Sequence, residues 1–313
     1  MGAGPEEAAV TKRYHPAILV SCEIPWDDDE RLIEDVFRQE IRAALEHFDD
    51  LYIFGTAGEG YAVTVPVFRE IVAVFREETD REGVHPMVGC IGLSTAQVVE
   101  RVGIACDAGF RVFQISLPPW GALNDAELVT YFTDVCGSFP DARFVHYNLL
   151  RPKRLLHAAD YRRLQDAVGN LVGTKSTGLG IGETLELARD TELMHFYGEA
   201  NFPLGCRHGE CGLLASYGAI FPAQTKELFE LGRQGRFGEL ARLHAEYLAV
   251  ADVFWEPAKA FGDLIDGAWD KMIVRASGID MPLRLLSPYQ SFPLEVYEAC
   301  VAGLRARHPE WLE

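Results

Sequence analysis

One lysine in this chain occupies a position that is hard to explain as an ordinary surface charge. Lys175 follows residues 171–174 (LVGT), which are typical of a buried strand, and residues 176–178 (STG) then turn the chain away. Three interpretations are open: a solvated charge, part of a phosphate-binding loop, or an amine kept in an apolar pocket. A phosphate loop needs Gly-x-x-x-x-Gly-Lys-Ser/Thr, and Thr174 separates Gly173 from Lys175, so the spacing argues against it.

An amine that burial keeps neutral can attack a carbonyl and form a Schiff base. Such a lysine needs a hydroxyl that moves protons, and N–H groups that hold the carboxylate of the substrate. Tyr147 ends the preceding apolar segment and is the natural hydroxyl, while the turn at residues 55–60 (GTAGEG) is the natural carboxylate cradle. Each signal alone is weak, because Tyr147 is also explained as a core aromatic and the turn as a simple loop.

The elements that must position these residues alternate along the chain. Eight short apolar segments predict strands, with helices between them, at residues 17–21, 51–55, 87–91, 112–116, 144–147, 171–174, 195–197 and 212–215. This pattern predicts an α/β fold, a (β/α)8 TIM barrel, whose active site lies at the carboxyl ends of the strands. Other polar residues at these ends include Glu23, Ser116, Glu199 and Asn201.

The predicted organisation has three parts. Residues 1–14 are expected to be a polar leader, residues 15–235 the barrel, and residues 236–313 a C-terminal helical region packed on it. Within that last part we expect helices at about 237–254, 257–276 and 293–307, because the apolar positions there recur with helical spacing.

Composition excludes several classes of function. Lysine and arginine total 29 against 47 acidic residues, a net charge of −18, which is unsuited to nucleic acid or an anionic membrane. The sequence contains neither a run of ~18 apolar residues nor a secretory signal pattern. Seven scattered cysteines indicate reduced thiols and a cytoplasmic location. The segment 206–211 (CRHGEC) lacks a second ligand pair, so we expect no metal and no cofactor.

These motifs together resemble the dihydrodipicolinate synthase and N-acetylneuraminate lyase superfamily of pyruvate-dependent class I aldolases and lyases. The family's Gly-Thr-Thr-Gly-Glu signature appears here as residues 55–59 (GTAGE), its Tyr-Asn pair as Tyr147 and Asn148, and its Schiff-base lysine as Lys175. The resemblance covers roughly residues 15 to 235. It implies a homo-oligomer, a tetramer or a dimer.

The resemblance also implies roles for particular residues. Lys175 would form the imine with a pyruvate-type 2-oxo acid, and Tyr147 would move the proton. The remaining members of the implied site surround the substrate: Gly55, Thr56 and Ala57 in the carboxylate turn, Thr177 near the lysine, and Leu214 on the wall.

The chain departs from the family pattern at three places. Ala57 replaces the second threonine, Trp120 stands where a relay tyrosine is expected, and Pro152 falls on the usual arginine. Trp120 would stack on the second substrate or seal the pocket. The basic residues around Pro152, namely Arg151, Lys153 and Arg154, would bind a distal acid group or form a solvated turn.

The sequence therefore predicts a Schiff-base lyase or aldolase acting on a 2-oxo acid, with an aldehyde as second partner, and not a true dihydrodipicolinate synthase. Two alternatives stay open. One is a dehydratase of a 2-keto-3-deoxy sugar acid that uses the same lysine. The other is a non-catalytic regulator that binds a 2-oxo acid.

Overall fold

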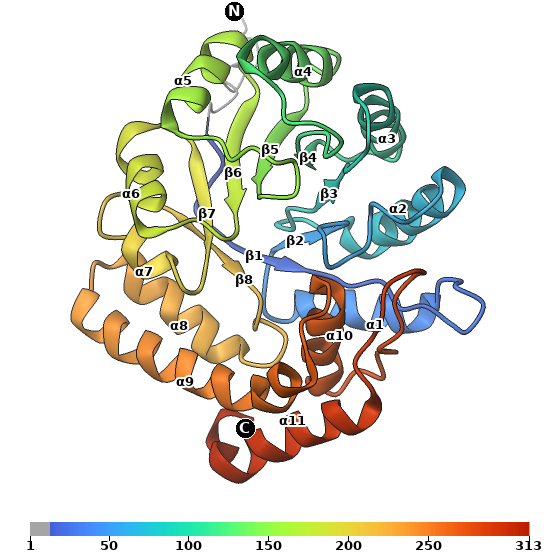
Figure 1. The fold of residues 1–313 in the computed structure, drawn as a ribbon, viewed down its shortest axis with the longest axis vertical. Helices are drawn as coiled ribbons and strands as arrows, with labels where there is room; N and C mark the ends of the chain where they lie inside the picture. The colour runs from blue at the N-terminus through green and yellow to red at the C-terminus, as the bar shows by residue number, and fades with distance from the viewer. Residues whose placement is uncertain (1–12, 313) are drawn as a thin grey trace, which may run out of the picture.

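Eight parallel strands close into a barrel in the computed structural model, which describes residues 13–312 (Figure 1). All eight overlap the predicted segments, so the (β/α)8 TIM barrel is confirmed. Strand β1 pairs with both β2 and β8, which closes the sheet. The strands are β1 (Ile18–Ser21), β2 (Asp50–Ile53), β3 (Met87–Gly89), β4 (Val112–Ile115), β5 (Arg143–Asn148), β6 (Leu171–Ser176), β7 (Met194–Gly198) and β8 (Gly212–Ala215).

Helices follow the strands and surround the barrel (Figure 1). They are α1 (Glu34–Leu45), α2 (Val65–Thr79), α3 (Thr95–Asp107), α4 (Asp125–Gly137), α5 (Ala158–Ala167), α6 (Ile181–Asp190), the short α7 (Phe202–Gly205) and α8 (Pro222–Arg233). The strands are buried on both faces, which explains why they read as continuous apolar runs in the sequence.

Three further helices lie on the side of β8 and β1: α9 (Phe237–Phe261), α10 (Asp266–Ala276) and α11 (Leu294–Arg307) (Figure 1). The predicted break near residue 255 is wrong, because α9 runs through Pro257 to Phe261. A proline removes the N–H that would bond the carbonyl four residues earlier. Here that carbonyl belongs to Val253, and Arg307 of α11 donates to it at 3.4 Å. A tertiary contact therefore satisfies the group that the proline leaves free.

Most of the predicted leader, residues 1–14, lies outside the described residues. Tyr14, its last residue, is buried at the end of the barrel away from the lysine. Its backbone N–H donates to the Val172 carbonyl at 2.9 Å, and its hydroxyl donates to Asp50 at 2.8 Å. Tyr14 thus belongs to the packing of the barrel interior.

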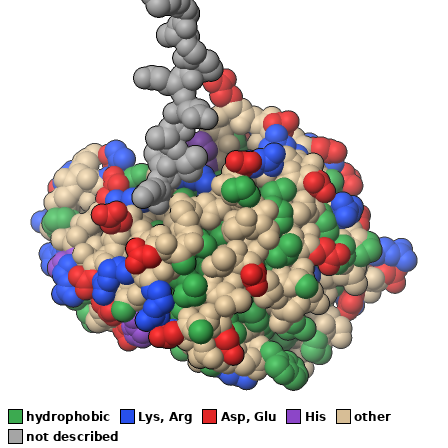
Figure 2. Space-filling view, turned by 90° about the horizontal axis from the view of Figure 1, so that it is seen from above, with side chains coloured by type: hydrophobic (Ala, Val, Ile, Leu, Met, Phe, Trp, Pro, Cys, Tyr) green, Lys and Arg blue, Asp and Glu red, His purple; other side chains and the backbone are tan. Residues whose placement is uncertain are grey.

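The surface view agrees with the acidic composition. On the face seen in Figure 2, basic side chains are interspersed with acidic ones and form no continuous basic patch. Within residues 13–312, none of the helices has the length and hydropathy that crossing a membrane requires.

Candidate active site

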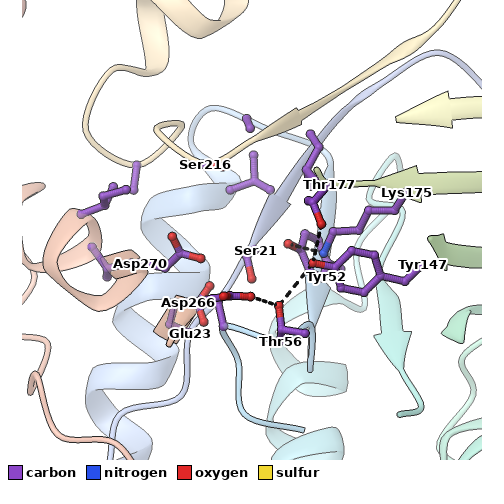
Figure 3. Close-up of a pocket in the computed structure, with 17 residues that line it drawn as sticks. Ser21, Glu23, Tyr52, Thr56, Tyr147, Lys175, Thr177, Ser216, Asp266 and Asp270 are labelled. Carbon is purple, nitrogen blue, oxygen red and sulfur yellow. Dashed lines mark hydrogen bonds between the residues drawn. The ribbon is translucent and has the colours of Figure 1, made fainter. Parts of the chain in front are cut away.

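A cavity of about 270 Å3 opens at the carboxyl ends of the strands, where the barrel rule places an active site (Figure 3). Its walls come from β1, β2, β5, β6 and β8, with α10 on the far side. The lining side chains that carry polar groups are Ser21, Glu23, Tyr52, Thr56, Tyr147, Lys175, Thr177, Ser216, Asp266 and Asp270.

Lys175 reaches this cavity from β6 and is only 2% exposed, so it is not a solvated charge. Its Nζ donates to the Tyr52 hydroxyl at 2.7 Å. The same nitrogen lies 3.9 Å from the ring centre of Tyr52 and 4.2 Å from that of Tyr147. Burial lowers the pKa of Lys175 to about 7, although the charges of Glu23 and Asp270 oppose the shift. A large share of the amine is therefore neutral and nucleophilic near neutral pH.

The glycine turn leaves room for this lysine. A Cβ atom on Gly55 would lie 2.8 Å from Tyr52 Cε2 and 3.2 Å from Lys175 Nζ, too close for both. The preceding residue, Phe54, has a φ of 59°, in the left-handed region that costs a non-glycine residue free energy. The turn is thus held in a strained shape directly behind the amine.

The same turn offers donors to the cavity. Thr56 and Ala57 both line it, and no acceptor within residues 13–312 takes a hydrogen bond from their backbone N–H groups. Adjacent N–H groups in a turn make a concave site for an anion. This arrangement fits the predicted carboxylate cradle.

Tyr147 stands in a chain of hydroxyl groups. Thr177 Oγ1 donates to Tyr147 Oη at 3.4 Å, Tyr147 lies 3.2 Å from Thr56 Oγ1, and Thr56 donates to the Asp266 carboxylate. Burial raises the pKa of Tyr147, and the two threonines oppose that effect. The phenol therefore holds its proton while hydrogen bonds connect it to a carboxylate.

Two acidic residues of α10 complete the wall, and they differ in their partners. Both oxygens of Asp266 accept from Arg151, at distances of 2.8 and 3.0 Å. Burial alone would raise the pKa of Asp266, but the hydrogen bonds from Arg151 and Thr56 lower it. Asp270, one helical turn later, is partly buried and has no such partner among residues 13–312.

A buried ion pair fixes α10 against the glycine turn. Glu59, the last residue of the GTAGE motif, accepts from Lys271 Nζ at 2.8 Å, and both side chains are fully buried. Glu59 also accepts from Trp26 Nε1 at 2.8 Å and from the Leu286 N–H at 2.7 Å. The carboxylate thus joins the turn, the β1 loop and the C-terminal region at one point.

The structure brings most of the predicted site residues together. Lys175, Tyr147, Thr56, Ala57, Thr177 and Leu214 line the cavity, and Gly55 packs behind Lys175. Two others do not line it. Trp120 is 86% exposed on the loop after β4, and Arg151 is engaged by Asp266. Of the other basic residues, Lys153 donates to the Trp120 carbonyl at 3.1 Å and Arg154 pairs with Asp125 and Asp160.

Signals in the sequence are weak or absent for several other lining residues. Tyr52 lies within the second predicted strand, where only its alternation along the strand indicates that it faces inward. Glu23 is visible as a polar residue after the first strand. No local signal places Asp266 and Asp270 over the barrel mouth, because their position depends on how α10 packs.

This fold and this site define a barrel that buries a lysine amine near the carboxyl end of its sixth strand. A model of the dihydrodipicolinate synthetase family matches residues 15–295, and the chain therefore belongs to that family. Its members include lyases of the class I aldolase type, so the family resemblance is confirmed.

Solved structures show the same fold at low sequence identity. YagE, a prophage protein of this family from E. coli K12 in complex with pyruvate, is 17% identical, with a TM-score of 0.81 over 93% of this chain and 98% of that one. A putative family protein from Coccidioides immitis is 22% identical, with a TM-score of 0.78 over 96% of each chain. N-acetylneuraminate lyase from Fusobacterium nucleatum is 14% identical, with a TM-score of 0.81 over 95% of this chain and 99% of that one. No curated protein matches by sequence.

Proposed function

We propose that this protein is a lyase or aldolase that forms a Schiff base between Lys175 and the ketone of a pyruvate-type 2-oxo acid. The observation that carries the proposal is the Lys175 amine itself. It is buried, its pKa is lowered to about 7, and it faces a cavity lined by two backbone N–H groups that have no acceptor within residues 13–312. The pyruvate bound in the E. coli relative is consistent with such a substrate.

The arrangement suits each step of imine formation. The N–H groups of Thr56 and Ala57 hold the carboxylate of the substrate and turn its ketone toward Lys175. The neutral amine attacks the ketone carbon. The Tyr52 hydroxyl, which bonds the amine, and the Tyr147 phenol, whose ring lies over it, then move protons as water leaves. The protonated imine then accepts the electron pair of a bond at the neighbouring carbon, so that bond breaks or forms at neutral pH.

The reaction is proposed to differ from dihydrodipicolinate synthesis. Ala57 has no hydroxyl, Trp120 does not line the cavity, and the arginine nearest to Pro152 is held by Asp266. A dehydratase of 2-keto-3-deoxy sugar acids is the second candidate, because the cavity holds carboxyl groups suited to protonating a leaving hydroxyl. The regulator interpretation is weaker, since binding alone needs neither a buried amine nor a hydroxyl chain.

A homo-oligomer and a cytoplasmic location also belong to the proposal. The exposed Trp120 and Leu150, on the loops after β4 and β5, support contact with another copy of the chain. All seven cysteines are free thiols, which supports a reducing compartment. Sedimentation of the purified protein measures the oligomeric state directly.

Exchange of the pyruvate methyl protons tests the proposed chemistry without knowledge of the second substrate. An imine in equilibrium with its enamine replaces these protons by deuterium in D2O, which proton NMR detects. We expect exchange with the wild type and none with Lys175→Ala. Lys226→Ala, at an exposed lysine of α8, is the matched control. Absence of exchange with both pyruvate and 2-oxobutyrate would contradict the proposal. Screening sugar acids for release of pyruvate then separates the lyase from the dehydratase.

A further inference from the structure

Two carboxyl groups stand on the side of the cavity away from Lys175 and Tyr147. Glu23 comes from the segment after β1, and Asp270 comes from α10 (Figure 3). Glu23 is only 1% exposed, whereas Asp270 is partly buried. Both therefore face the space where the part of a substrate beyond the ketone would lie.

These two carboxyls lack the partners that other buried acids of the region have. Asp266 is held by Arg151, Glu59 by Lys271, and Glu199 by the backbone N–H groups of residues 216 and 217. By contrast, Glu23 Oε2 is buried with no hydrogen-bond partner of standard geometry among residues 13–312. The Ser21 hydroxyl beside Glu23 only opposes the rise of the Glu23 pKa. Asp270 lines the cavity without the arginine that holds Asp266. Buried polar groups are normally paired, so an unpaired carboxyl that lines a cavity indicates a ligand that pairs with it.

The protonation of the two groups narrows the kind of ligand. Burial raises the pKa of Glu23 to about 7. Burial, and then the charge of Glu23, raise the pKa of Asp270 well above its usual range. A raised pKa favours the neutral carboxyl, which carries an O–H donor beside an acceptor oxygen. Such a group matches a hydroxyl, because a hydroxyl both donates and accepts.

A second carboxylate on the substrate would find no partner in this part of the cavity. Lys175 is the only lysine or arginine among the described residues that line the cavity, and the imine would consume it. Arg151 is already bonded through two nitrogens to Asp266. A carboxylate beside Glu23 would meet like charge, which weakens its binding.

The cavity has room for such an extension. One water-sized group takes roughly 30 Å3, and the cavity measures about 270 Å3, which is more than pyruvate alone requires. The floor between the lysine and the two carboxyls carries the Ser21 hydroxyl, which also has no hydrogen-bond partner of standard geometry among residues 13–312 (Figure 3). This side of the cavity therefore carries polar groups, Ser21 Oγ and Glu23 Oε2, that are available to a ligand.

We propose that Glu23 and Asp270 bind an uncharged, hydroxyl-bearing chain on the substrate and exclude substrates that carry a second carboxylate there. The inference rests on the proposed function, because it takes Lys175 as the point of covalent attachment. It assigns the substrate class: a 2-oxo acid extended by a hydroxylated chain, or the corresponding hydroxyaldehyde as the partner of pyruvate.

Borohydride trapping with a series of 2-oxo acids tests this assignment without the natural substrate. The series comprises pyruvate, 2-oxobutyrate, 4-hydroxy-2-oxobutyrate and 2-oxoglutarate, and intact-protein mass spectrometry measures the half-saturating concentration of each. In the wild type we expect the half-saturating concentration of 4-hydroxy-2-oxobutyrate to be about tenfold lower than that of 2-oxobutyrate. We expect the half-saturating concentration of 2-oxoglutarate to be about tenfold higher than that of pyruvate.

The variants separate charge from hydrogen bonding. Glu23→Gln removes the charge of the carboxylate. The half-saturating concentration of 2-oxoglutarate should then fall to within about twofold of that of pyruvate. Asp270→Ala removes a hydrogen-bonding group and should abolish the preference for the hydroxylated acid. Asp263→Asn, at an exposed acid just before α10, is the matched control and should change neither ratio. If Glu23→Gln does not fold, Asp270→Asn replaces it, because Asp270 is less buried.

The outcomes distinguish the binding role of Glu23 and Asp270 from the Schiff-base function of Lys175. If pyruvate labels Lys175 but 2-oxoglutarate labels equally well in the wild type, the assignment of Glu23 and Asp270 is overturned and the Schiff-base function stands. The same holds if neither ratio changes in the variants. If no 2-oxo acid labels Lys175 in any protein of the series, the proposed function itself fails.

Discussion

Lys175 Nζ lies 2.7 Å from the hydroxyl of Tyr52 and 3.9 Å from the centre of the same ring. The hydroxyl of Tyr52 therefore accepts a hydrogen bond from the amine, and the ring of Tyr52 shields the amine from solvent. The two residues come from β6 and β2, strands that are not neighbours in the barrel, so the contact crosses its interior. Because this contact desolvates the amine and also supplies a proton carrier, several measurable properties depend on it.

Tyr52→Phe keeps the ring over the amine and removes only the hydroxyl. We expect imine formation with pyruvate to slow by about 10- to 100-fold, since proton transfer by a positioned side chain contributes at least that much. The initial rate of borohydride trapping is the measurement. Tyr61→Phe is the control, because the Tyr61 hydroxyl has no hydrogen-bond partner among the described residues. A wild-type rate in Tyr52→Phe would remove this tyrosine from the mechanism.

Imine formation should depend on pH through the lysine. Burial lowers the pKa of Lys175 to about 7, so the amine is protonated and inert below that value and neutral above it. The rate should rise through about pH 7 and then level off, whereas an ordinary lysine would keep gaining beyond about pH 9. The charge of Glu23 raises the pKa of Lys175. The midpoint should therefore move to lower pH in Glu23→Gln, and a move to higher pH would contradict this.

Gly55→Ala should disable the site without unfolding the barrel. The added methyl would lie 2.8 Å from Tyr52 Cε2 and 3.2 Å from Lys175 Nζ, so both side chains must shift. Misplacement of a reacting group by about 1 Å costs on the order of 100-fold in rate. The rate of borohydride trapping with pyruvate should fall by about that factor. The circular dichroism spectrum should stay unchanged, because the barrel remains folded. Gly121→Ala, where no atom lies within 4 Å of the new methyl, should trap at the wild-type rate.

The Glu59–Lys271 pair should behave as a buried unit. Lys271→Met leaves a buried carboxylate without its cation, and we expect a loss of about 3–5 kcal/mol in the free energy of unfolding. Glu59→Gln should cost a similar amount. The double variant should lose clearly less than the sum of the two, as denaturant unfolding can measure. Glu230→Gln, which breaks the exposed pair with Arg233, should change stability by less than about 1 kcal/mol. Additive losses from the single variants would show that the pair is not coupled.

The sequence could predict those parts of the site that follow from strand order. Eight apolar segments indicate the barrel, and neighbouring strands place their last residues side by side. The pairing of Tyr147 with Lys175 across β5 and β6 is a direct case. The glycine turn also follows from the sequence, because backbone N–H groups in a glycine-containing turn suit a carboxylate.

The rest of the site depends on tertiary packing, which leaves no local signal. Asp270 reaches the cavity because α10 packs over the barrel mouth, where the neighbouring Lys271 pairs with Glu59 and apolar residues of the helix are buried. The exposed position of Trp120 depends on the path of a loop, and the engagement of Arg151 depends on α10. The Glu59–Lys271 and Arg151–Asp266 contacts join residues that are 212 and 115 positions apart, so spacing within one segment cannot predict them.

The most direct test of the Schiff-base role of Lys175 is to locate the covalent bond. The protein is treated with pyruvate and borohydride, digested and mapped by mass spectrometry. We predict one reduced pyruvate adduct, on the peptide that contains Lys175, and no adduct in Lys175→Ala. An adduct on a different lysine, or none with any 2-oxo acid although the variant and the wild type are both folded, would contradict the assignment of Lys175 as the Schiff-base residue.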